Sequence, residues 1–237
     1  MRRLLKLIRN IILFCLIFCI AIGGIIGYNG YQMYQDAISK MSIEEKIEEI
    51  KSDENYVTLD EIPKEYKDAV ISVEDHRFYS HFGVDVIALS RAVITNISTM
   101  SLAEGGSTIT QQLAKNMYFS QEKLFTRKIA ELFVALELEQ MCSKDEILEM
   151  YMNISYFGDG FYGIREASIG YLNKEPKDMT LEECTLLAGI PNAPSVYALS
   201  NHTDLTIQRQ IQVIDAMVKY DNMDAKKAEK LKEEIRK

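Results

Sequence analysis

The chain has 237 residues, which is enough for one sizeable domain or two small lobes. Its apolar fraction of 47% and charged fraction of 26% are typical of a folded globular protein and argue against a disordered chain. The net charge of -8 argues against a general role in binding nucleic acid.

The amino terminus predicts a membrane anchor. Segment 1–10 is basic, and segment 11–28 carries no charge and is rich in Ile, Leu and Phe. Such a segment can cross a bilayer as a single helix. Because the basic residues come first, we expect a cytoplasmic tail, a single-pass anchor in the cell membrane and an extracytoplasmic body. A cleaved signal peptide is the alternative, although no clear A-x-A site is present.

Segment 29–56 is rich in glutamate and predicts a mostly polar linker helix that leads away from the membrane. Thr58 to Glu61 has the pattern of a capping box, and Pro63 fits the first turn of a helix. The buried face of that helix should include Tyr66 and Val70. The helix should end at Glu74.

Charged and aromatic residues gather in the stretch from Glu74 to Gly83. Two adjacent carboxylates, Glu74 and Asp75, follow an apolar segment. A carboxylate in that position is expected to be partly removed from water, which suits proton abstraction. A solvated polar cap at a helix end is the alternative interpretation of the same stretch.

Asp85 is expected to cap the next helix, whose unusually apolar sequence favours a core helix over a membrane-touching one. Gly105 to Asn116 then combines two glycines, hydroxyl residues and a helical pattern. This arrangement is typical of a loop that leads into a helix N-terminus, where free amides attract anions. A P-loop is excluded because the G-K-[ST] ending is missing, and a solvated helix face is the alternative.

Further helices are predicted to the end of the chain. Thr126 can cap one helix, and capping boxes begin two others at Ser143 and Thr180. The glycine-rich loop 154–163 is expected to line a cleft. Segment 201–237 predicts one or two amphipathic helices, and no strand is convincing, so the fold class is mainly α. Cys142 and Cys184 are expected to be free thiols, with a disulfide as the alternative.

Four groups of residues, in this order, resemble the motifs of the peptidoglycan glycosyltransferases of family 51, the lysozyme-like transglycosylase domains of penicillin-binding proteins. The groups are Glu74-Asp75-x-x-Phe78-x-x-His81-x-Gly83; Gly106-x-Thr108-x-Thr110-Gln111-Gln112-Leu113-x-Lys115-Asn116; Arg127-Lys128-x-x-Glu131; and Lys144-x-x-Ile147-Leu148-Glu149-x-Tyr151-x-Asn153. The resemblance implies a two-lobed (head and jaw) helical domain over residues 57–200, behind the transmembrane helix. Because the smaller lobe of that family enters the bilayer, the resemblance also favours membrane contact for the apolar helix after Asp85 more than composition alone does. No room is left for a transpeptidase domain, so a monofunctional member is expected. Asn173 stands where the family often has glycine, and asparagine also tolerates a left-handed helix cap.

The resemblance implies that the protein polymerises lipid II into β-1,4-linked glycan strands and releases undecaprenyl diphosphate, with inversion. It assigns Glu74 as the general base and Glu131 as a second catalytic carboxylate that orients substrate or holds a metal. Phe78 is expected mainly to pack. The substrate-binding residues that it implies are Asp75, Phe78, His81, Ser107, Thr108, Gln112, Lys115, Asn116, Lys123, Arg127 and Lys128.

The partners that the resemblance implies are lipid II, the growing lipid-linked strand, the membrane and other cell-wall synthesis proteins. A divalent cation, Mg²⁺ or Mn²⁺, could bridge the phosphates, but no ligand cluster in the sequence establishes one. A lysozyme-like hydrolase or lytic transglycosylase is the alternative enzyme, since such folds also place a glutamate beside a sugar cleft. A non-catalytic membrane scaffold is the second alternative.

Overall fold

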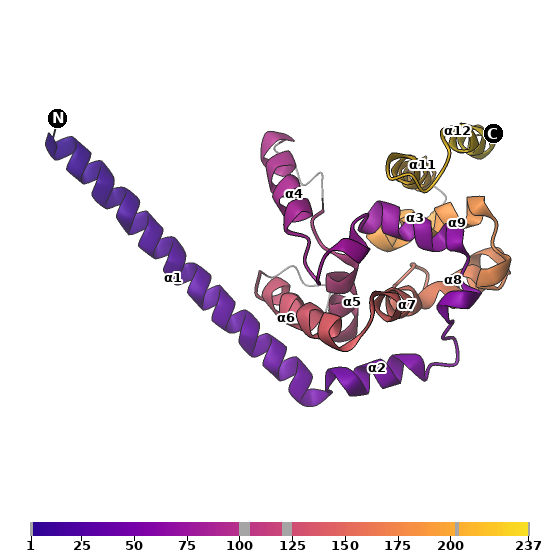
Figure 1. Cartoon of the computed structure of the whole chain (residues 1–237), viewed down its shortest axis with the longest axis horizontal. Helices are drawn as coiled ribbons and strands as arrows, with labels where there is room; N and C mark the ends of the chain where they lie inside the picture. The colour runs from indigo at the N-terminus through magenta and orange to yellow at the C-terminus, as the bar shows by residue number, and fades with distance from the viewer. Residues whose placement is uncertain (1, 100–104, 120–124, 202–203, 237) are drawn as a thin grey trace.

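The computed structural model describes residues 2–99, 105–119, 125–201 and 204–236. Within these ranges the chain is helical, and extended pairing is limited to isolated bridges (Figure 1). The predicted mainly α class is therefore confirmed. The helices are α1 (Arg2–Lys40), α2 (Ile43–Lys51), α3 (Lys64–Glu74), α4 (Val86–Thr99), α5 (Ile109–Tyr118), α6 (Phe125–Met141), α7 (Lys144–Ile154), α8 (Gly163–Leu172), α9 (Leu181–Gly189), α10 (Pro194–Tyr197), α11 (Asp204–Lys219) and α12 (Ala225–Ile235).

The first helix, α1, is long and apolar enough to cross a membrane. It continues past the predicted end of the span at residue 28, so residues 29–40 belong to α1 and not to a separate linker helix. No proline interrupts it. A new helix begins only after Ser42, whose side chain and that of Glu45 form a capping box for α2.

The end of α1 packs closely against α6. A Cβ atom placed on Gly30 would lie 2.4 Å from Ile129 Cβ, so only glycine allows this approach. The ring of Phe133 lies 5.4 Å from the rings of both Tyr31 and Tyr34. The Tyr34 hydroxyl also donates a hydrogen bond to Glu137 on α6. The C-terminal end of α1 is therefore a packed part of the folded body.

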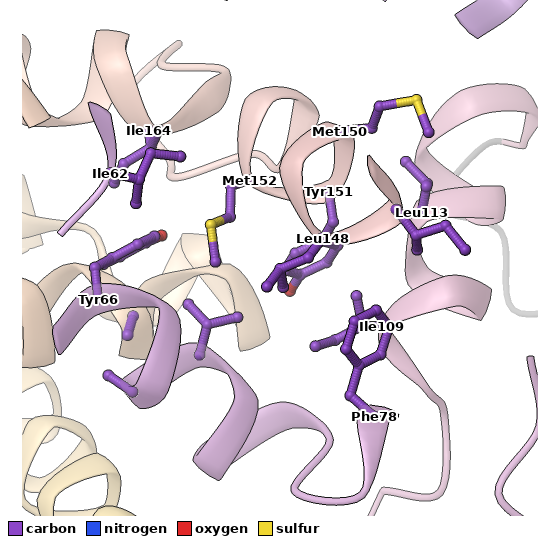
Figure 2. Packing of buried hydrophobic residues seen from close by; sticks show 14 of the residues in the cluster. Ile62, Tyr66, Phe78, Ile109, Leu113, Leu148, Met150, Tyr151, Met152 and Ile164 are labelled. Atoms are coloured by element: carbon purple, nitrogen blue, oxygen red, sulfur yellow. The ribbon is translucent and has the colours of Figure 1, made fainter. Parts of the chain in front are cut away.

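One apolar core lies among α3, α5, α7, α9 and α11. Figure 2 shows Tyr66 of α3, Ile109 of α5 and Leu148 of α7 converging on it from separate helices. Each fully buried side chain of this size stabilises the fold by about 1.5–3 kcal/mol relative to an exposed one. The core fixes the positions of the helix ends that carry the charged motifs.

The helix ends test the predicted caps. The boxes at Ser143 and Thr180 begin α7 and α9 as expected. The Thr58 box begins only a short 3₁₀ turn, and Pro63 lies at the N-cap of α3, one position before its first turn. Thr126 lies inside α6. Asn173 ends α8 with φ 55° and ψ 41°, the left-handed cap expected for it.

The helix α4 projects away from the rest of the body (Figure 1). Asp85 begins it, since its carboxylate accepts a hydrogen bond of 2.8 Å from the Ala88 amide and two more from Arg77. The apolar side chains of Val86, Ile87, Leu89 and Ile94 are exposed. The prediction of a core helix from its composition is therefore wrong.

Cys142 and Cys184 are free thiols, as expected.

Candidate active site

The Glu74 carboxylate lies at the end of α3 and is only 7% exposed. One oxygen accepts a hydrogen bond of 3.0 Å from Arg209 Nη2, and the other accepts one of 2.8 Å from Gln112 Nε2. The Tyr151 hydroxyl in turn contacts Gln112 Oε1 at 3.3 Å. Donors from α11 and α5 therefore hold the carboxylate from two sides.

Arg209 is a site residue that the sequence reasoning did not single out. It lies on α11, in the segment placed outside the catalytic domain by the predicted boundary at residue 200. Its Nε also donates to the Gly189 carbonyl at 3.3 Å. Arg209 lies four residues before the buried Val213 and eight before the buried Met217, so the three share one face of α11. An arginine on the apolar stripe of an amphipathic helix is the signal that could have revealed it.

The loop after Glu74 is fixed to the start of α5. Both oxygens of the buried Asp75 carboxylate lie within 3.0 Å of His81 Nε2, and Oδ2 also accepts from the Ile109 amide at 3.1 Å. Thr108 caps α5 and donates to the Gly83 carbonyl at 2.6 Å. Asp75, His81 and Thr108 thus hold the loop in place.

Phe78 is fully buried beneath this loop, as the expected packing role requires. The Lys144 ammonium lies 4.5 Å from the centre of its ring and pairs with Glu139 at 2.7 Å. Thr110 donates a hydrogen bond of 2.6 Å to the same carboxylate. This buried network supports the loop that carries Asp75 and His81.

A second charged group surrounds Glu131 on α6, whose side chain is fully buried. Arg127 Nε lies 2.8 Å from one of its oxygens, and Lys128 Nζ lies 2.7 Å from the other. Each cation reduces the cost of burying the carboxylate. In return, Glu131 fixes the positions of both cations.

Lys115 on α5 links the two carboxylates. Burial lowers the pKa of its ammonium, and the charges of Lys128 and Arg127 lower it further, whereas Glu131 and Glu74 act in the opposite direction. The Lys115 ammonium forms no hydrogen bond or ion pair with a described residue. It is therefore a cation available to an anionic ligand beside Glu74.

The other predicted site residues differ in placement. Ser107 is half-buried next to Thr108. Asn116 lines a separate cavity bounded by α2 and the segment after α7. Lys123 lies outside the described residues.

The charges around Glu131 also bear on the expected metal. In the ranges that the structure describes, no three His, Cys, Asp or Glu side chains come together as metal ligands. Both oxygens of Glu131 face cations, which would repel a divalent ion. These surroundings are a poor fit for Mg²⁺ or Mn²⁺.

The arrangement combines two chemical abilities. The Glu74 carboxylate accepts hydrogen bonds and donates none. Each of its oxygens accepts one hydrogen bond from the protein and has a further lone pair for an incoming proton. Next to it, Lys115, Arg127 and Lys128 provide positive charge around a buried carboxylate. A hydroxyl could lose its proton on one side while an anionic group is held on the other.

The chain is similar to known proteins over much of its length. A family model described as Transglycosylase matches residues 42–218, a range that includes Arg209. Penicillin-binding protein 1F of Bacillus subtilis is 47% identical over 172 residues, which are 73% of this chain and 24% of that protein. A putative transglycosylase of Cupriavidus necator is 42% identical over 164 residues, covering 69% of this chain and 71% of the relative.

Penicillin-binding protein 1A of Neisseria flavescens is 46% identical over 163 residues, which are 20% of its length. The chain thus spans about a quarter or less of several of the curated relatives that it matches. Among solved structures, penicillin-binding protein 1A of Haemophilus influenzae aligns with a TM-score of 0.45 and 19% identity, over 76% of this chain and 17% of that one.

Proposed function

This chain belongs to the transglycosylase family, and from that premise we propose that it is a membrane-anchored peptidoglycan glycosyltransferase. It polymerises lipid II into β-1,4-linked glycan strands and releases undecaprenyl diphosphate. The observation that carries this proposal is the arrangement of α5, whose Gln112 donates a hydrogen bond of 2.8 Å to Glu74 and whose Lys115 follows three positions later. The charges of Glu131 and Glu74 both act on the Lys115 ammonium. Glycosyl transfer from a diphosphate needs a base and a cationic site side by side.

In the proposed reaction, Glu74 removes the proton from the 4-hydroxyl of the GlcNAc unit of lipid II. That oxygen attacks C1 of the MurNAc unit at the end of the growing strand, and the bond from C1 to the diphosphate oxygen breaks. The α-linked diphosphate becomes a β-1,4 bond because the displacement inverts C1. Hydrogen bonds from Arg209 and Gln112 hold the carboxylate in a fixed orientation while one of its lone pairs accepts the proton.

The departing diphosphate gains negative charge as the bond breaks. The Lys115 ammonium forms no hydrogen bond or ion pair with a described residue, so it can contact the diphosphate directly. Arg127 and Lys128, held by Glu131, add to the positive field. In this proposal Glu131 acts by positioning these cations and not by holding a metal.

The lipid parts of both substrates explain the apolar surfaces. α1 crosses the membrane with its basic start in the cytoplasm. α4 points away from α2 and α7, as does the N-terminal half of α1 (Figure 1). Its exposed apolar side chains enter the outer face of the bilayer, so that the polyprenyl chains stay in the membrane during the reaction.

A lytic transglycosylase or hydrolase is the alternative use of a buried glutamate, but cutting a glycan releases no anion that needs three cations. Incubation of the purified chain with labelled lipid II, followed by gel separation of the products, decides between them. We expect a ladder of lengthened strands. Unchanged lipid II together with cleavage of added glycan would overturn the proposal.

A further inference from the structure

A groove of about 600 Å³ with both polar and apolar walls lies outside the group around Glu74. One side is formed by α2 and the segment that follows it, and the other by the chain connecting α7 to α8. Its walls include Tyr156, Tyr162, Glu166 and, from the end of α5, Asn116. We propose that this groove binds an N-acetylated oligosaccharide. It would hold a glycan strand at a second place on the enzyme, away from the reacting atoms.

Two tyrosines form a rigid aromatic wall. The rings of Tyr156 and Tyr162 lie 4.7 Å apart, and an antiparallel bridge joins the two residues. Tyr162 is 58% exposed, although its ring is large and apolar. Two backbone hydrogen bonds of 2.9 Å hold the turn between them: the Phe157 amide donates to the Phe161 carbonyl, and the Phe161 amide donates to the Gly158 carbonyl. Sugar rings pack their C–H faces on such rings, and a preformed wall lowers the entropy cost of binding.

The polar atoms of the groove match hydroxyl and acetamido groups. The Glu166 oxygens accept hydrogen bonds from Asn55 Nδ2 at 3.2 Å and from the Tyr162 amide at 2.8 Å, and each can accept another. The side chain of Asn116 forms no hydrogen bond with a described residue. Its amide can both donate and accept, as an acetamido group requires of its partner.

The charge of the groove excludes anionic ligands. Glu49, Asp53 and Glu166 line it, and its lysine, Lys46, already pairs with Glu49. Phosphate groups and nucleic acids would be repelled. A neutral saccharide suits this environment. Naming the bound strand as the polymer that the enzyme makes depends on the proposed function, but saccharide binding itself does not.

The test is calorimetric titration of the full-length chain, in detergent micelles, with a chitooligosaccharide. We expect binding that Tyr162→Ala weakens about tenfold, the order of one lost aromatic contact. Tyr79→Ala is the matched control, because Tyr79 is 57% exposed but lies outside the groove. Glu74→Gln should also leave this affinity unchanged, because Glu74 does not line the groove.

Three results would overturn the groove assignment: no binding, binding that is lost in Glu74→Gln but kept in Tyr162→Ala, or tighter Tyr162-dependent binding of an oligolysine peptide. The last would identify the groove as a binding site for basic peptides instead. The groove assignment and the proposed function can be rejected independently of each other. A chain that binds the saccharide through Tyr162 but cannot polymerise lipid II would contradict only the proposed function, and an active chain without such binding would contradict only the groove.

Discussion

Arg209 Nη2 lies 3.0 Å from Glu74 Oε1, so a residue of α11 completes the surroundings of a carboxylate that α3 delivers 135 positions earlier in the chain. The arginine side chain is 12% exposed and the glutamate side chain 7%. A charge-assisted hydrogen bond in such a shielded place is strong and directional. It fixes the rotamer of the proposed base before substrate arrives.

We expect Arg209→Ala to lower kcat by about 10- to 100-fold, because a hydrogen bond to a charged group is worth roughly 1.5–3 kcal/mol. KM should change less, since Arg209 acts through Glu74. Arg209→Lys should recover part of the loss. Gln212→Ala, which removes another partner of the same guanidinium, is the control and should leave kcat near the wild-type value. Full activity in Arg209→Ala would show that Glu74 needs no such support.

Lys115 should set an alkaline limit on the reaction. Burial lowers the pKa of its ammonium below the ordinary value of 10.5, so the group loses its charge at a lower pH than an exposed lysine. As pH rises through that lowered pKa, contact with the diphosphate weakens and kcat/KM should fall. Lys115→Arg keeps its charge in this range and should remove that limb from the pH profile. An identical alkaline limb in the arginine variant would assign it to another group.

Glu131 should contribute to stability as well as to activity. Glu131→Leu would leave Arg127 and Lys128 beside a buried apolar side chain, at a cost of about 3 kcal/mol. We therefore expect a clearly lower Tm by circular dichroism. Glu44→Leu, at an exposed position of α2, should change Tm little. Equal Tm values for the two variants would contradict the positioning role of Glu131.

The contact between α1 and α6 can be tested with two glycines. A Cβ atom on Gly30 would collide with Ile129 and would lie 2.9 Å from the Thr126 carbonyl oxygen. A Cβ atom on Gly27 would meet no other atom within 4 Å. Gly30→Leu should therefore separate α1 from α6, at a cost of about 1–3 kcal/mol, and expose the junction to limited proteolysis. Gly27→Leu should be cleaved like the wild type. Equal cleavage of both variants would mean that α1 is only a flexible tether.

Local patterns predicted much of this fold. The capping boxes of α7 and α9 and the left-handed cap at Asn173 depend on residues a few positions apart, and all three are present. The helix after Asp85, predicted to lie in the core, is exposed. The prediction failed because apolar composition alone does not distinguish a core helix from one that faces a membrane. The junction at residue 28 carries no proline, and α1 continues through it despite the glycines at 27 and 30.

The site was predictable only where its residues lie in compact motifs. Glu74 and Lys115 belong to such motifs, and the structure brings them near each other. The Arg209 contact arises from the packing of α11 on α3. The apolar stripe of α11 can mark the arginine as inward-facing, but it does not identify Glu74 as the partner. Asn116 follows Lys115 directly, but successive helical positions point in different directions, and it lines the separate groove.

The role of Glu74 as general base is tested most directly by the turnover of labelled lipid II by Glu74→Gln. The amide keeps the shape of the carboxylate but cannot take the hydroxyl proton. We expect polymerisation to fall by at least about 100-fold, with the affinity for lipid II and the Tm close to wild-type values. Polymerisation at a near-normal rate in this variant would contradict the account.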